Sequence, residues 1–131
     1  MTTRHAACSC RQLHFKTTGD PVRISMCHCL DCQRRTGSVF GAQARFPRDE
    51  VSIHGRSSTY VRTADSGNLI TFHFCPSCGG TVYYQIDDQP DLIAVPIGAF
   101  ADPDFPPPTV SVYEVRRHPW VSVPDDAERI D

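Results

Sequence analysis

Cysteine is the residue of this sequence with the clearest potential for chemistry, because seven cysteines fall into three groups at metal-ligand spacing. The groups are "CSC" (Cys8, Cys10), "CHCLDC" (Cys27, Cys29, Cys32) and "CPSC" (Cys75, Cys78). A CxxC turn wraps around a single ion, and CxC on an extended strand presents both sulfurs on one face, so such pairs are typical of zinc ligands. A disulfide framework is not expected, because an odd count would leave one thiol over.

The three groups can be combined into metal sites in two ways. Pairing "CPSC" with the last two cysteines of "CHCLDC" gives the CxxC...CxxC of a zinc ribbon, but it leaves three cysteines without a role. Pairing "CPSC" with "CSC" gives a closed four-sulfur site and leaves "CHCLDC" as a three-sulfur site, which accounts for all seven cysteines. The spacing alone leaves both arrangements open.

A three-sulfur site differs in kind from a four-sulfur site. Closed four-thiolate zinc sites stabilise folds, whereas zinc with three protein ligands keeps a position for water or substrate. Such a position can bind an added thiol, lower its pKa and place it beside a carbonyl group. For a three-sulfur "CHCLDC" site we therefore favour thiol activation over labile zinc storage.

A short helix is expected to position the last cysteine of this group. Asp31 is a candidate N-cap, "CQRRT" contains no helix breaker, and Gly37 suits the left-handed residue that ends a helix. The predicted helix near residues 31–37 puts Cys32 in its first turn. There the unpaired backbone N–H groups and the helix dipole favour a thiolate.

Short alternating segments surround this helix and predict a mainly β domain. They are residues 13–15, 22–29, 42–46, 50–54, 58–62, 69–74, 81–86, 92–100 and 110–115. Within residues 22–29 the alternation places one set of side chains on the same face, namely Arg23, Ser25, Cys27 and Cys29. His28 should then point away from the two cysteines. Residues 101–108 are too rich in proline for a sheet and are predicted to form a surface excursion.

Length and charge limit the classes of function. The 131 residues predict a single domain, 1–131, and thirteen basic against fifteen acidic residues give a net charge of −2. That balance disfavours nucleic acid as a partner, because phosphate binding needs a basic surface. No stretch approaches the ~18 apolar residues of a membrane span, and no apolar leader is recognised. We therefore expect a cytoplasmic protein with no membrane partner.

The sequence resembles the glutathione-dependent formaldehyde-activating enzyme family, whose domain is shared with the centromere protein V group. The resemblance rests on "CSC", "CHCLDCQRRTGS" and "FCPSCGGTVYY", with "PIGAF" and "RRHPWVSVPDD", and it runs over about residues 6–126. It implies a small zinc-stapled β-tent of short antiparallel strands, similar to methionine sulfoxide reductase B. It also implies the second arrangement of the cysteines. A structural zinc would be held by Cys8, Cys10, Cys75 and Cys78, and a catalytic or labile zinc by Cys27, Cys29 and Cys32.

The activity implied by the resemblance is that of a carbon–sulfur lyase or synthase. It would use up to two zinc ions per chain, with glutathione as the co-substrate. Its partners would be a small-molecule thiol and an aldehyde, joined in an adduct like S-hydroxymethyl-glutathione. The alternative is a non-enzymatic zinc-binding or protein-interaction module with a structural zinc and a labile, thiol-responsive zinc. Methionine sulfoxide reduction is disfavoured, because the four-plus-three scheme leaves no redox-active cysteine.

Several further residues are candidates for the site. Arg34 and Arg35 could pair with the carboxylates of glutathione, since a guanidinium binds a carboxylate through two parallel hydrogen bonds. A solvated helix face is the alternative for both arginines. Weaker candidates are two histidines beside the cysteines, two aromatic residues and one serine: His28, His73, Phe100, Trp120 and Ser38. An ordinary structural role explains each of these five at least as well.

Overall fold

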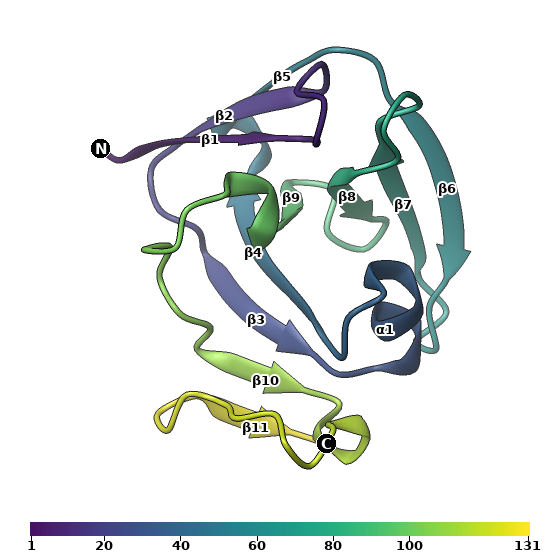
Figure 1. The fold of residues 1–131 in the computed structure, drawn as a ribbon, viewed down its shortest axis with the longest axis vertical. Helices are drawn as coiled ribbons and strands as arrows, with labels where there is room; N and C mark the ends of the chain where they lie inside the picture. Colours follow the sequence, from purple (N-terminus) through teal and green to yellow (C-terminus); the bar gives the residue numbers. More distant parts are fainter.

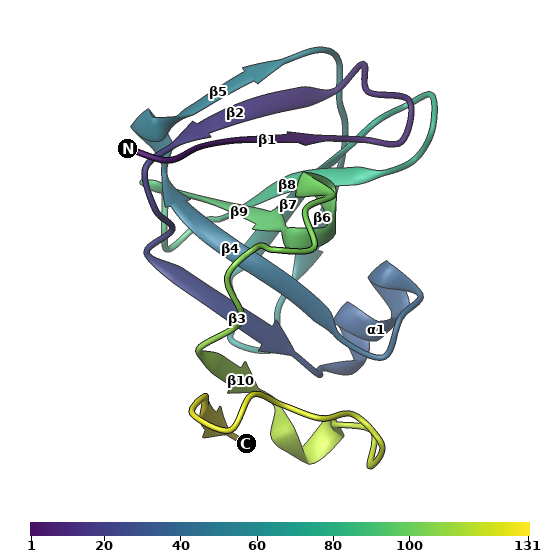
Figure 2. The same ribbon diagram turned by 60° about the vertical axis from the view of Figure 1, so that its left-hand side comes forward.

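The computed structural model describes residues 1–131 and shows two β-sheets and one α-helix (Figure 1). The smaller sheet has three strands in the order β1–β2–β5. The larger sheet has eight strands in the order β11–β10–β3–β4–β9–β8–β7–β6. Figures 1 and 2 show the small sheet across the top of the molecule, with the large sheet curving beneath it. The prediction of a mainly β fold with one short helix is confirmed.

The bounds of the elements follow the predicted segments closely in the middle of the chain. The small sheet contains β1 (Thr3–Ala7), β2 (His14–Thr18) and β5 (Val51–His54). The large sheet contains β3 (Arg23–Cys27), β4 (Gly41–Pro47), β6 (Ser58–Thr63), β7 (Leu69–Phe74), β8 (Thr81–Ile86), β9 (Leu92–Pro96), β10 (Val110–Val112) and β11 (Glu128–Ile130). No helix is long and apolar enough to cross a membrane.

Three predicted strands are too long, and two observed strands were not predicted. The segment 22–29 is a strand only over Arg23–Cys27, because Cys29 already caps the helix. The segment 92–100 leaves the sheet after Pro96 and forms a 3-10 turn over Ile97–Phe100, because proline has no N–H to continue the ladder. The segment 110–115 ends at Val112, since Tyr113 takes a left-handed conformation with φ of 56°. The unpredicted strands are β1 and β11. The latter pairs in parallel with β10, which pairs in parallel with β3, whereas the other strand pairs are antiparallel.

The main hydrophobic core lies between the two sheets. Phe15 from β2 meets Phe100 and Tyr83 edge-on, with ring centroids 6.2 Å apart in both pairs. Cys8 and Cys75 belong to this same cluster of buried side chains. The loops that carry these two cysteines are therefore fixed by core packing as well as by their own turns.

The helix α1 (Leu30–Thr36) begins two residues earlier than the proposed cap allows. Its N-cap is Cys29, whose backbone is extended and whose Sγ accepts the N–H of Cys32 at 3.2 Å. Asp31 is therefore a residue of the first turn, and its prediction as the N-cap is wrong. Cys32 lies in the first turn and Gly37 ends the helix with φ of 70°, both as predicted.

A buried polar network joins β10 and the residues just after it to the residue between β3 and α1. The ring of His28 is fully buried, and its Nε2 lies 2.8 Å from Ser111 Oγ. The Ser111 hydroxyl in turn donates to the Glu114 carboxylate, which two arginines neutralise, Arg117 and Arg129. Burial lowers the pKa of His28, so a neutral ring that donates from Nε2 to Ser111 fits the site.

Candidate metal centres

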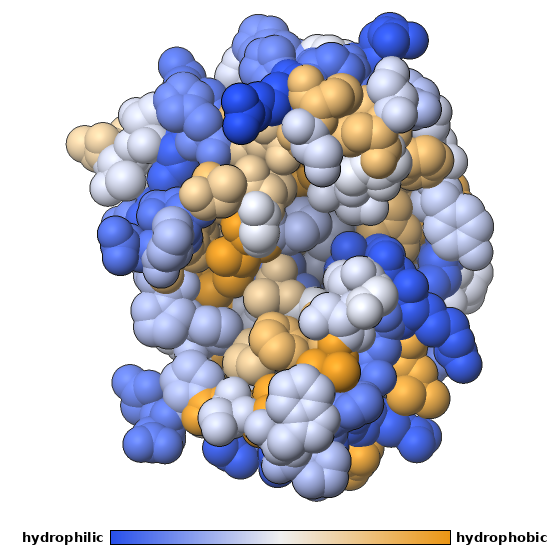
Figure 3. Space-filling view, viewed as in Figure 1, coloured by the Kyte–Doolittle hydropathy of each residue, from blue (hydrophilic) through white to orange (hydrophobic).

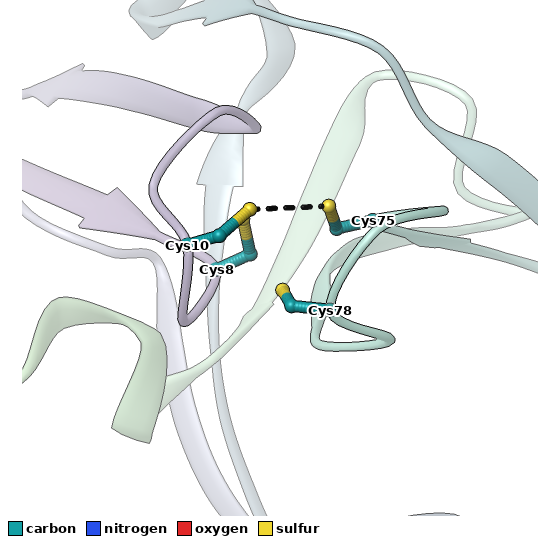
Figure 4. Close-up of side chains that lie close together, drawn as sticks. All are labelled: Cys8, Cys10, Cys75 and Cys78. Atoms are coloured by element: carbon teal, nitrogen blue, oxygen red, sulfur yellow. Dashed lines mark hydrogen bonds between the residues drawn. The ribbon is translucent and has the colours of Figure 1, made fainter.

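The first candidate centre joins two loops that are distant in sequence. Figure 4 shows the four sulfurs of Cys8, Cys10, Cys75 and Cys78 turned toward one another, from the turn after β1 and the turn between β7 and β8. All four Sγ atoms lie within 4.8 Å of one another. The Sγ atoms are 3.7 Å apart for Cys8 and Cys10, and 3.6 Å apart for Cys10 and Cys75.

These separations fit a tetrahedral zinc site. Zinc–sulfur bonds of about 2.3 Å in tetrahedral geometry place the sulfurs roughly 3.8 Å apart. A disulfide would need about 2.05 Å, and all seven cysteines are free thiols. The donor set therefore suits zinc, and a closed site of this kind would tie the two sheets together.

The loops around these sulfurs supply hydrogen-bond donors that favour thiolates. Cys75 Sγ accepts the Gln12 side-chain amide at 3.0 Å and the Ser77 backbone N–H at 3.3 Å. Burial opposes ionisation of Cys75, but these donors and the backbone N–H of Cys78 outweigh it and lower its pKa to about 5. The same kind of backbone donation, from Cys10 and Gly80, lowers the pKa of Cys78.

The second candidate centre is built where β3 meets α1. Cys27 ends the strand, Cys29 caps the helix and Cys32 lies in its first turn, and their sulfurs also lie within 4.8 Å of one another. Hydrogen bonds from the thiols of Cys27 and Cys32 lower the pKa of Cys29 to about 2. The same hydrogen bond raises the pKa of Cys27, because there the Cys27 thiol is the donor. For Cys32, a bond with Cys27 lowers the pKa, but the bond with Cys29 and burial leave it raised.

The three thiols thus share protons and cannot all ionise side by side without a compensating positive charge. A divalent cation supplies that charge, so this donor set also suits zinc. Unlike the four-sulfur cluster, it leaves one position of a tetrahedron without a protein sulfur.

The second centre opens into a cavity of about 240 Å³. Four arginines line this cavity from four different elements: Arg23 in β3, Arg35 in α1, Arg45 in β4 and Arg62 in β6. Its apolar wall contains Phe72 and Tyr84. The Arg35 guanidinium lies 5.1 Å from the Phe72 ring centroid and 5.5 Å from that of Tyr84, and Arg62 lies 5.1 Å from Phe72. Stacking on these rings holds both guanidiniums in place.

The weaker candidates from the sequence lie elsewhere. Arg34 has 78% of its side chain exposed, faces Asp31 at 4.0 Å and does not line this cavity. His73 stacks on Tyr83 with ring centroids 4.2 Å apart and belongs to neither group of candidate metal ligands. Of the remaining candidates, Phe100 is in the core, Trp120 and Ser38 are exposed, and His28 is buried against Ser111. Hydrophilic side chains dominate the periphery of the face that carries α1, and apolar ones show toward its middle (Figure 3).

Sequence reasoning missed three of the four arginines in this cavity. The alternation of β3 already places Arg23 on the face of Cys27, so the signal for that residue was present. Arg45 and Arg62 can be assigned to the cavity only when the register of β4 and the order of the strands in the large sheet are known.

Comparisons with known proteins add to this geometry. A family model described as glutathione-dependent formaldehyde-activating enzyme matches residues 3–116. An uncharacterized lyase of Schizosaccharomyces pombe is 27% identical over 77 residues, which cover 59% of this chain and 53% of the relative. The match thus spans about half the length of that relative. A crystal structure of a Rhodobacter sphaeroides protein superimposes with a TM-score of 0.57 and 16% identity, over 79% of this chain and 91% of the other, and shares the fold.

Proposed function

Because this chain belongs to the glutathione-dependent formaldehyde-activating enzyme family, we propose that it is a zinc-dependent carbon–sulfur lyase or synthase. It forms or cleaves the adduct of a thiol and an aldehyde, with glutathione as the thiol. The observation that carries the proposal is the contrast between the two centres. Four sulfurs close the first centre, whereas three sulfurs form the second, which opens into a cavity lined by arginines.

The two centres would have different roles because they have different numbers of sulfur ligands. Cys8, Cys10, Cys75 and Cys78 would hold a structural zinc, and Cys27, Cys29 and Cys32 a catalytic one. The zinc at the second centre would supply a position at which an added thiol loses its proton near neutral pH.

In the synthetic direction one carbon–sulfur bond forms between the thiol sulfur and the aldehyde carbon. The carbonyl π electrons move to the oxygen, which takes up one proton while the thiol gives one up, so the reaction is balanced without an oxidant. Arg62 can donate N–H groups to the oxygen on which negative charge develops, because its guanidinium is fixed against Phe72 inside the cavity. Arg35 can bind a carboxylate of the thiol.

The test is the loss of formaldehyde with and without glutathione, on protein with a known zinc content. The proposal requires the wild-type protein to accelerate formaldehyde loss above the spontaneous reaction with glutathione. Cys32→Ser should abolish this acceleration and should melt close to wild type, because the four-sulfur centre is untouched. Equal rates with and without the wild-type protein would refute the proposal.

A non-enzymatic zinc module is the second candidate, and one observation favours it. Cys29 is only half-buried, so a thiol from solvent could reach the three-sulfur centre and remove its zinc. In that case glutathione would release one zinc ion per chain while formaldehyde loss stayed at the spontaneous rate. Measuring zinc release with a chromogenic chelator in the same samples separates the two functions.

A further inference from the structure

We propose that the cavity selects thiols that carry an anionic group at the end away from the sulfur, and that Arg23 and Arg45 bind this anion. The inference rests on the proposed function, because it assumes that a thiol is bound at Cys27, Cys29 and Cys32. It adds the residues that recognise the end of the thiol away from the sulfur.

The register of β3 and β4 arranges residues of the cavity in three cross-strand pairs, which we call rungs. In the antiparallel pair of β3 and β4, Cys27 lies opposite Gly41, Ser25 opposite Gln43, and Arg23 opposite Arg45. Alternate residues of a strand share a face, and all of these residues except Gly41 line the cavity. Four residues at about 3.3 Å each separate the sulfur rung from the arginine rung by roughly 13 Å at the backbone. A ligand bound at the sulfurs therefore extends along the strands toward the two arginines.

The arginine rung carries unbalanced positive charge. Like charges directly opposite each other across two strands repel and destabilise the sheet. Neither guanidinium makes a salt bridge, and the Nε atoms of both Arg23 and Arg45 are buried without a hydrogen-bond partner. An anion between them would accept hydrogen bonds from both side chains and remove the repulsion.

The acidic residues of the cavity do not neutralise this rung. Asp65 and Asp88 line the cavity but are exposed, and Asp31 faces Arg34. Asp88 attracts Arg45 electrostatically, but it forms its hydrogen bond with Asn68 at 3.0 Å. The two arginines are thus available to a ligand.

The middle rung indicates what lies between the sulfur and the anion. Gln43 donates from Nε2 to Ser25 Oγ at 2.7 Å, which leaves its buried Oε1 without a partner. A free amide oxygen at this position accepts an N–H or O–H group of the ligand. The cavity volume corresponds to about eight water molecules, below the usual range for drug-sized ligands, so the ligand is compact. A thiol with an amide linker and a terminal carboxylate has these features.

The experiment compares two ligands that differ only in charge. N-acetyl-cysteinyl-glycine and its C-terminal amide are titrated into zinc-loaded wild-type protein, Arg23→Gln, Arg45→Gln and Arg34→Gln by isothermal calorimetry. We expect wild type and Arg34→Gln to bind the carboxylate form roughly 10- to 100-fold more tightly than the amide, as expected for charge-assisted hydrogen bonds. Arg23→Gln and Arg45→Gln should each reduce this preference several-fold, because each variant removes one of the two guanidiniums that bind the anion.

A second readout separates recognition from a structural role. Without ligand, Arg45→Gln should melt at or above the wild-type temperature because the repulsion with Arg23 is removed. A lower melting temperature for this variant would overturn the assignment of the pair as an unbalanced rung. Equal binding of both ligands by wild type, or an unchanged preference in both arginine variants, would overturn the inference and leave the proposed function standing. Failure of both ligands to bind wild type would overturn the thiol site itself.

Discussion

Replacing Cys75 by serine should unfold most of the protein under conditions in which the wild type is folded. The Cys75 side chain is fully buried in the main core, and its sulfur lies 3.6 Å from that of Cys10. Serine has a similar size but is a poor zinc ligand, so the substitution removes one of the four sulfurs with little change in volume. The effect should therefore report on the metal rather than on core packing.

The magnitude follows from the thermodynamics of metal-coupled folding. Structural zinc contributes about 10–16 kcal/mol in small zinc-binding domains, and a typical domain is stable by only about 5–15 kcal/mol. Even a partial loss of zinc affinity would thus remove most of the folding free energy. The four sulfurs join the loop at residues 8–10 to the loop at residues 75–78, so this loss would also release the small sheet from the large one.

The assay is denaturant unfolding followed by far-ultraviolet circular dichroism, with zinc quantified in each sample. Cys29→Ser is the matched control, because serine is a good N-cap and can replace the sulfur that accepts the Cys32 N–H. This control should stay within about 1 kcal/mol of wild type. The reasoning is refuted if Cys75→Ser unfolds like wild type while Cys29→Ser is the variant that loses its fold.

Three further outcomes are expected. Fully loaded protein should contain two zinc ions per chain by elemental analysis, and a chelator should remove the ion of the three-sulfur centre first, because that centre has fewer protein ligands. Ser111→Ala should lower the free energy of unfolding by about 1–3 kcal/mol, since it leaves His28 Nε2 buried without its partner; denaturant midpoints measure this change. Gly41→Ala should lower the free energy of unfolding by at most about 1–3 kcal/mol, the usual cost of adding a methyl group at a packed site, and should weaken glutathione binding in calorimetry. Its new Cβ would lie 3.2 Å from Arg35 Nη2, and that flexible side chain must move.

The fold was predictable where local rules decide it. Gly37 ends the helix in a left-handed conformation, and β7 and β8 have the bounds that their alternation indicates. These local rules fail where contacts between residues distant in sequence determine the structure. Tyr113 takes a left-handed conformation that non-glycine residues seldom adopt, and the parallel pairing of β10 with β3 depends on a chain that returns after more than 80 residues.

In the candidate site, too, some features follow from local sequence and others depend on contacts between distant residues. Cysteines two or three residues apart lie together because their spacing requires it, but spacing could not decide which groups meet across the fold. Asp31 and Cys29 both offer an acceptor for a helix cap, and the extended backbone at Cys29 selects the sulfur. The pairing of Arg23 with Arg45 needs the strand register, which the sequence pattern of either strand alone does not contain.

The most direct test of the central claim is the rate of glutathione-dependent formaldehyde loss in Cys29→Ser and wild-type protein with matched melting curves. The cap of α1 survives in this variant, so the fold is kept while one of the three sulfurs is lost. Changes in the partners of a ligand alone cost metal sites about 10- to 100-fold, so losing a ligand should lower the accelerated rate by about 100-fold or more. We predict a folded protein with this loss of activity. A folded Cys29→Ser protein that consumes formaldehyde at the wild-type rate would contradict the account.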